Sequence, residues 1–116
     1  MVLRLVYDGV SFLLTGDMFS EAEGVLVRGD ASLDGDVLKV GHHGSRSSSS
    51  AEFLDRVSPS VTVVSAGEGN RFGHPHPETL EALLARVPED RLFVTSQRGT
   101  VEFVTDGRRL KVRTER

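Results

Sequence analysis

The sequence predicts a single α/β domain, residues 1–116, with a mixed sheet, helices and terminal β-hairpins. Short apolar runs of strand length alternate with segments of helical periodicity, the pattern of a layered α/β sheet. Both ends of the chain carry paired β runs separated by turn dipeptides. The length of 116 residues and the 27% of charged residues suit one globular domain.

Apolar runs predict the strands. The first two, Val2–Tyr7 and Val10–Thr15, flank Asp8-Gly9, a dipeptide that favours a type I′ hairpin turn because that turn needs positive φ at both positions. The later runs are Asp36–Val40, Val61–Ser65, Leu92–Thr95, Thr100–Thr105 and Leu110–Arg113. The run Val61–Ser65 is apolar in succession, which is typical of a strand covered on both faces.

Capping residues and periodicity predict three helices. Ser20 with Glu23, and Ser49 with Glu52, have the spacing of capping boxes. The third helix begins at Pro77, because proline is favoured in the first turn of a helix. Its apolar positions, spaced i, i+3, i+4 and i+7, are Leu80, Leu83, Leu84 and Val87.

Composition excludes several classes of protein. There is no cysteine, so disulfide bonds and thiolate zinc sites are excluded. The apolar runs are far shorter than the roughly 20 residues that span a bilayer, which predicts a soluble domain. The net charge of −3 argues against a generally basic nucleic-acid coat, although residues 107–116 hold five basic residues against one acidic residue.

Two loops carry candidate metal ligands. Asp17 follows the second strand, and His42 and His43 follow the third, between Gly41 and Gly44. Carboxylate oxygen and imidazole nitrogen suit zinc, manganese or iron. Taken singly, each loop has an ordinary alternative: a helix N-terminal aspartate for Asp17 and surface histidines for the pair. Loops after separate parallel strands meet at one edge of a sheet, so together they predict a metal site.

The serine run and the third loop supply candidate substrate contacts. Ser45 opens a run of hydroxyls ahead of a helix N-terminus, a geometry suited to an anion. Arg71 carries a fork-shaped donor for phosphate. Asn70, His74 and His76 lie in the same loop, where the i, i+2 histidines either bind a metal or pack and cap the next helix.

Three strings in this order resemble the metallo-β-lactamase-like domain of ComEC-type DNA internalisation proteins. They are Phe-Leu-Leu-Thr-Gly-Asp (12–17), Val-Leu-Lys-Val-Gly-His-His-Gly-Ser (37–45) and Asn-Arg-Phe-Gly-His-Pro-His-Pro (70–77). The resemblance covers nearly the whole chain. It implies an αββα sandwich with a hydrolytic metal site, of which this chain is the C-terminal half. The H-x-H-x-D-H motif, which supplies most ligands in the superfamily, has no counterpart in these residues.

The resemblance also assigns residues. Asp17 matches an aspartate that can bridge two metals, and one of His42 and His43 matches the last histidine ligand. The position after glycine favours His42 slightly. These three form the expected catalytic and metal-binding set. The segments expected to line the substrate cleft contain Ser45, Asn70, Arg71, His74 and His76.

In the intact domain the resemblance implies zinc or manganese, phosphodiester hydrolysis, and DNA uptake in competence. We expect the chain alone to be inactive, with no tightly held metal. Expected partners are the missing N-terminal half, the membrane channel region of a parent protein in the bacterial cell membrane, DNA, and a second copy joined through exposed sheet edges. Two alternatives remain: a degenerate, non-catalytic DNA-binding or assembly module, and a lactonase or other esterase of the same superfamily.

Overall fold

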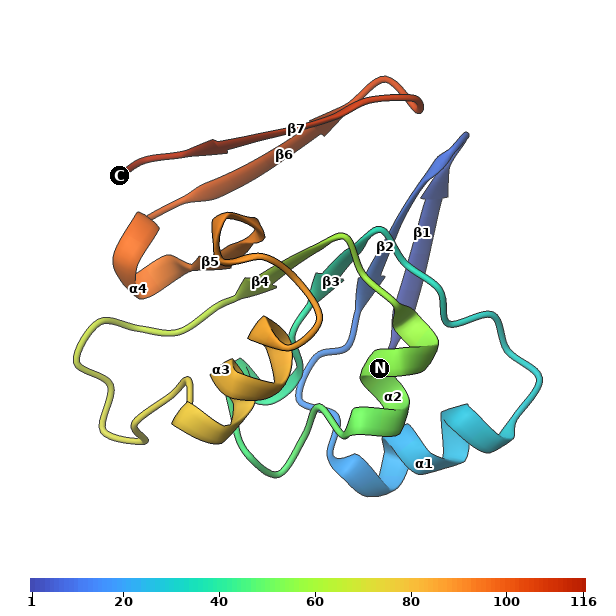
Figure 1. Ribbon diagram of the computed structural model, residues 1–116, viewed down its shortest axis with the longest axis horizontal. Helices are drawn as coiled ribbons and strands as arrows, with labels where there is room; N and C mark the ends of the chain where they lie inside the picture. Colours follow the sequence, from blue (N-terminus) through green and yellow to red (C-terminus); the bar gives the residue numbers. More distant parts are fainter.

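The computed structural model describes all residues, 1–116, and confirms the α/β class with a mixed sheet and a terminal hairpin (Figure 1). The main sheet has the order β1-β2-β3-β4-β5. Its strands are β1 (Leu3–Tyr7), β2 (Val10–Leu14), β3 (Val37–Lys39), β4 (Val61–Val64) and β5 (Leu92–Val94). β1 pairs antiparallel with β2, and the other three pairings are parallel.

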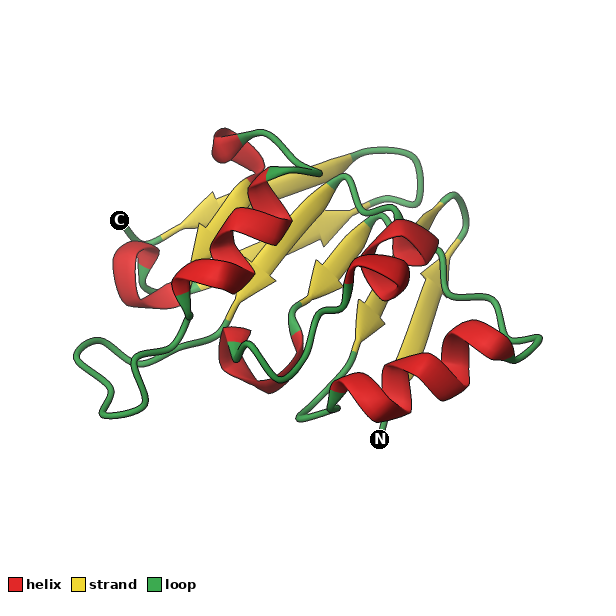
Figure 2. Cartoon of the chain, turned by 60° about the horizontal axis from the view of Figure 1, so that its bottom comes forward, coloured by secondary structure: helices red, strands yellow, loops and turns green.

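The helices cover one face of this sheet, and the C-terminal hairpin covers part of the other (Figure 2). The helical segments are α1 (Ser20–Arg28), η1 (Gly41–Gly44), α2 (Ala51–Val57), α3 (Pro77–Leu84), η2 (Glu89–Arg91) and α4 (Thr95–Arg98). The hairpin strands β6 (Val101–Thr105) and β7 (Leu110–Thr114) form a separate two-stranded sheet. None of the helices has the length and hydropathy needed to cross a membrane.

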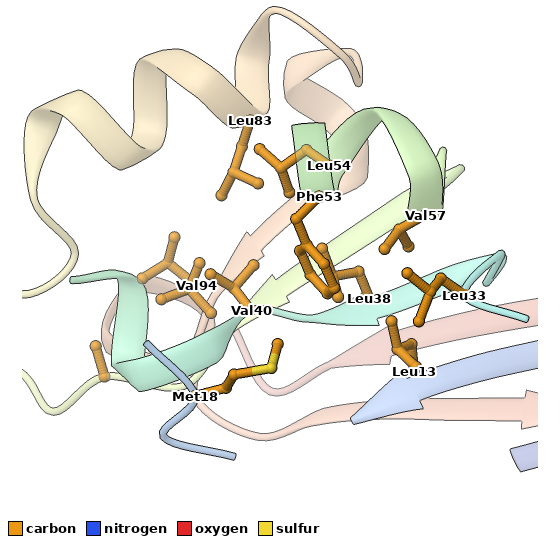
Figure 3. Packing of buried hydrophobic residues seen from close by; sticks show 12 residues of the cluster. Leu13, Met18, Leu33, Leu38, Val40, Phe53, Leu54, Val57, Leu83 and Val94 are labelled. Atoms are coloured by element: carbon orange, nitrogen blue, oxygen red, sulfur yellow. The ribbon is translucent and has the colours of Figure 1, made fainter. Parts of the chain in front are cut away.

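The main core lies between the sheet and the helices (Figure 3). Leu13 and Leu38 from the strands meet Phe53, Leu54 and Leu83 from α2 and α3, and all five are at most 1% exposed. All four residues of β4 are buried, as expected for a central strand covered on both faces. The apolar run of that strand therefore reflects two packed layers.

The hairpin packs on the opposite face through alternate residues. Phe12 of β2 meets Phe103 of β6 edge to face, with ring centroids 6.2 Å apart. A backbone hydrogen bond of 2.8 Å from Gly9 to Gly107 joins the turns of the two hairpins. β1 forms an outer edge, where Leu5 and Tyr7 are each more than half exposed. An apolar sheet edge therefore remains accessible to solvent.

Local details differ from the sequence predictions at the turns and caps. Asp8 has positive φ but Gly9 does not, so the first turn is not the predicted type I′. Neither predicted capping box forms. Phe19 precedes α1 without a side-chain cap, and Ser50, not Ser49, caps α2 by accepting from the amide of Phe53. The one-turn helix α4 follows β5, in addition to the three predicted helices.

Glu23 explains the failure of the first capping box. Its side chain is 1% exposed and leaves α1 for the serine loop before α2. The carboxylate oxygens accept the backbone N–H groups of Ser49 at 2.6 Å and Ser50 at 2.8 Å. The glutamate therefore joins α1 to that loop, a tertiary contact that outweighs the local cap.

Candidate metal and substrate site

The three predicted loops meet at one edge of the sheet, where β2, β3 and β4 end. Backbone hydrogen bonds join them, because the amide of His42 donates to the Gly16 carbonyl at 2.8 Å and the amide of His76 to the Gly44 carbonyl at 3.0 Å. The second loop thus lies between the first and the third. This confirms the predicted convergence.

Two glycines allow this close approach. A Cβ on Gly41 would lie 3.1 Å from the Thr15 hydroxyl oxygen. A Cβ on Gly44 would lie 2.6 Å from Cβ of Pro75 in the third loop, and the φ of Gly44 is +83°. Any larger residue at position 44 meets both a steric overlap and an unfavourable backbone conformation. The glycines around the histidines are therefore packing requirements between loops.

The two histidines between these glycines have left-handed backbones. His42 has a φ of 49° and His43 a φ of 55°. This region costs L-residues roughly 1–2 kcal/mol each, so the surrounding hydrogen bonds must hold the turn in place. Such conformations concentrate at functional sites.

His43 and Asp17 form the donor pair of the site. The Nδ1 atom of His43 lies 2.8 Å from the Ser65 carbonyl oxygen, which only accepts, so Nδ1 carries a proton in this hydrogen bond. The other nitrogen, Nε2, lies 3.5 Å from Oδ1 of Asp17, and in the neutral Nδ1–H tautomer it presents a lone pair toward that oxygen. In that tautomer two electron-rich atoms face each other at a distance that a shared cation would stabilise. A carbonyl on the far ring nitrogen is typical of a metal-binding histidine.

His42 points into a different environment. Its Nδ1 atom lies 3.2 Å from the Ser47 hydroxyl, which in turn lies 2.8 Å from the Ser45 hydroxyl. The Phe19 ring contacts the His42 ring edge to face at 4.8 Å. The geometry therefore favours His43 over His42 as the partner of Asp17. It also places the buried Ser45 in a chain of hydroxyls that orients His42.

The third loop is held by two of the predicted substrate residues. The amide of Asn70 makes four hydrogen bonds to the backbone of residues 67–74. His76 accepts the Arg46 N–H on Nδ1 at 2.9 Å, so its Nε2 carries the proton and donates to the Phe72 carbonyl at 3.1 Å. Asn70 and His76 therefore use their polar atoms inside the fold, which gives both a positioning role.

His74 lies among the other histidines. Its ring centroid is 4.8 Å from that of His76, 5.7 Å from that of His42 and 6.3 Å from that of His43. Partial burial lowers the pKa of His74, and the charges of the other three imidazoles lower it further. Both effects favour the neutral form of the His74 ring.

Two basic side chains at the same edge of the sheet, Lys39 and Arg71, form no ion pair with an acidic side chain. Desolvation lowers the pKa of the Lys39 ammonium, while the Asp17 carboxylate acts in the opposite direction. The Lys39 charge thus acts on the Asp17 carboxylate of the donor pair. Sequence reasoning did not single out Lys39, although this residue lies within the second string. Arg71 lies over the ring of Phe72, 5.1 Å from its centroid.

The donor set is incomplete as a metal site. No three histidine, aspartate or glutamate side chains converge closely enough to hold a metal ion. Asp17 and His43 supply two donors, whereas a structural zinc site has four and a catalytic zinc site three plus an open position. The pair fits one side of such a site.

Comparison with known proteins gives three relatives. ComE operon protein 3 of Bacillus subtilis is 38% identical over 103 residues, which are 89% of this chain and 13% of that protein. Competence protein ComA of Neisseria gonorrhoeae is 40% identical over 105 residues, 88% of this chain and 15% of that protein. Recombination protein 2 of Haemophilus influenzae is 42% identical over 80 residues, 68% of this chain and 10% of that protein.

The homologues are competence and recombination proteins. The chain spans between 10% and 15% of the length of these curated relatives. It matches no protein-family model and no solved structure. The similarity in sequence supports the competence part of the resemblance, while the metallo-β-lactamase part depends on the motifs and on the site geometry.

Proposed function

We propose that this chain supplies one side of a metal-dependent phosphodiester hydrolase site in a protein of competence and DNA uptake. The observation that carries the proposal is the pair formed by Asp17 Oδ1 and His43 Nε2, 3.5 Å apart, with the other nitrogen of His43 held by the Ser65 carbonyl. The names of the similar proteins support the link to competence.

The residues fit zinc or manganese as a partial ligand set. A carboxylate oxygen and a neutral imidazole nitrogen are donors that both metals accept. The further ligands come, in this proposal, from residues outside this chain, consistent with its small share of the relatives' length. A bound divalent cation would supply hydroxide at neutral pH by lowering the pKa of its water ligand.

Under this proposal each residue of the candidate site has a defined role. Asp17 and His43 would hold the cation, and the Ser65 carbonyl orients the His43 ring so that its Nε2 atom lies beside the Asp17 carboxylate. Lys39 and Arg71 contribute positive charge that favours a phosphodiester beside the donor pair. Asn70 and His76 fix the loop that carries Arg71.

The partners proposed for this chain are the N-terminal half of the domain, the membrane channel region of the parent protein, DNA, and a second copy. The exposed side chains of β1, such as Leu5 and Tyr7, support the first and the last of these. An unpaired apolar edge strand is a surface that proteins normally cover. Sedimentation at high concentration checks self-association, which Leu5→Lys should weaken.

One observation favours a second function. Because no three potential ligands converge, the chain could instead belong to a non-catalytic module that binds DNA or assembles a competence complex. Under this alternative Asp17 and His43 contribute only local structure. Variants that keep the fold but remove the donors separate the two functions.

A chimera provides the functional test. This chain replaces the matching segment of competence protein ComA in Neisseria gonorrhoeae, and transformation frequency is measured. We expect Asp17→Asn and His43→Gln to abolish transformation. Asp30→Asn, which removes an exposed carboxylate after α1, is the matched control. Normal transformation by both donor variants would refute the hydrolase proposal and support the assembly module.

A binding measurement on the purified chain complements the chimera. Mn²⁺ broadens the NMR signals of groups near it even when it binds weakly. We expect the ring signals of His43 to broaden at lower Mn²⁺ concentrations than those of His76, whose ring nitrogens are both engaged. Asp17→Asn should remove this difference. Equal broadening of both rings in the unmodified chain would count against the donor pair.

A further inference from the structure

A cavity of about 190 Å³ lies beside the donor pair, and His43 and Phe72 are among the residues that line it. We propose that this cavity receives a nucleobase of single-stranded nucleic acid, stacked on the Phe72 ring, with the adjoining phosphodiester at the Asp17–His43 pair. The inference deepens the proposed function and rests on it. It assigns Phe72 as the residue that holds the substrate's base.

Phe72 has the exposure and the neighbours of a stacking platform. Its side chain contributes nothing to the core, and the residue remains 61% exposed. The His74 ring lies nearly parallel to it, with an interplanar angle of 22° and centroids 5.6 Å apart. The Arg71 guanidinium lies over the ring. Aromatic rings combined with arginine are the recurrent means of binding single-stranded nucleic acid.

The platform is rigid before any ligand arrives. The Asn70 side-chain oxygen accepts the Phe72 N–H at 3.2 Å and the His74 N–H at 2.9 Å. His76 donates to the Phe72 carbonyl, so the backbone of Phe72 is held at both its N–H and its C=O. A preformed platform avoids the entropy that ordering a flexible loop on binding would cost.

Stacking on Phe72 predicts tolerance of base sequence. Asn70 is engaged by the backbone and has no free group to recognise a base edge. Ala66 and Gly67, which have no polar side-chain atoms, also line the cavity, together with His43 and His74. Stacking discriminates little among bases because every base has an aromatic face. A base inside a duplex is already stacked and paired, so the cavity selects single strands.

A unique fluorophore tests the contact directly. The sequence has no tryptophan, so Phe72→Trp places a single indole at the platform. The purified chain is titrated with a short oligothymidylate, an oligodeoxyadenylate, the duplex of the two, and an abasic oligomer of the same length and charge. We expect both single strands to quench the indole, and the duplex and the abasic oligomer to leave it unchanged.

Matched variants control for general electrostatic binding. Tyr7→Trp places the indole at another exposed aromatic position, in β1, and should show no quenching. Phe72→Ala should weaken binding of a labelled oligothymidylate at least about fivefold in fluorescence anisotropy, while Tyr7→Ala leaves the affinity unchanged. Equal quenching by the abasic oligomer, or an unchanged affinity of Phe72→Ala, would overturn the inference.

The result separates this inference from the proposed function. Loss of transformation in the Asp17→Asn chimera without base-dependent quenching at position 72 would leave the hydrolase proposal standing and refute the stacking platform. Base-dependent quenching together with normal transformation by Asp17→Asn would support the platform and refute the hydrolase.

Discussion

Replacing Glu23 by glutamine tests the contact that holds the serine loop. The substitution keeps the size of a side chain that is 1% exposed. It replaces one of two carboxylate oxygens, which accept from Ser49 at 2.6 Å and Ser50 at 2.8 Å, by an NH₂ group. The new NH₂ group then faces a backbone N–H group of the serine loop, so two buried donors oppose each other. The remaining hydrogen bond loses its charged acceptor.

The expected loss of stability follows from these two bonds. A hydrogen bond to a charged group contributes about 1.5–3 kcal/mol, and a neutral one about 1 kcal/mol. Losing the first bond and weakening the second predicts that Glu23→Gln lowers the free energy of unfolding by about 2–4 kcal/mol. A domain stable by about 5–15 kcal/mol remains largely folded after such a loss.

Urea denaturation followed by circular dichroism measures this change. Glu21→Gln is the matched control, because Glu21 is exposed on the same helix and its replacement should change stability by less than about 0.5 kcal/mol. Hydrogen exchange of the Ser49 and Ser50 amides should accelerate only in Glu23→Gln. A free energy of unfolding equal to that of Glu21→Gln would refute the claim that the buried carboxylate holds this loop.

Three further predictions concern the loops, the C-terminal hairpin and activity. Gly44→Ala should destabilise the chain by about 2–5 kcal/mol in urea denaturation, because it adds overlap with Pro75 to the cost of positive φ. Gly69→Ala, at a φ of +64° with open space around it, should carry only the backbone cost of about 1–2 kcal/mol; equal losses would show that the contact with Pro75 is unimportant. The backbone N–H of Thr100 lowers the pKa of Glu115, so the carboxylate stabilises the hairpin above the pKa of the unfolded chain and this contribution is lost as pH falls through the folded-state pKa. Glu115→Gln should therefore flatten the acid side of the stability curve, and an unchanged pH dependence would contradict that role. The purified chain should hydrolyse no phosphodiester with zinc or manganese, since two donors do not hold a catalytic metal; metal-dependent turnover would contradict this.

Local sequence patterns predicted the strands and helices of the fold, because the formation of these elements depends mainly on residues close together in the sequence. The apolar runs marked the strands to within one or two residues, and the continuous run in β4 indicated its burial on both faces. The order of strands and helices was enough to bring three loops to one edge. Helix α3 began at Pro77 as predicted but ended at Leu84, so Val87 lies beyond it.

Contacts between distant residues were beyond the same patterns. The spacing of Ser20 and Glu23 is that of a cap, yet Glu23 finds better donors 26 and 27 residues away. The sequence predicted the terminal hairpin but not its position: β6–β7 forms its own sheet and packs across the main one through Phe103. Phe72 lies within the third string, but no local pattern marks the phenylalanine itself, because its place is set by the hydrogen bonds of Asn70.

The choice between His42 and His43 shows the same limit most clearly. In consecutive left-handed residues successive side chains diverge, so neighbours in sequence face different loops. One ring turns to Ser47 and the other to Ser65 and Asp17. The position of His42 directly after a glycine does not indicate which of the two rings faces Asp17. Gly41 and Gly44 are required by packing against the first and third loops. The strained turn therefore lets one short segment make two sets of contacts: one imidazole meets the serine hydroxyls while the other completes the donor pair.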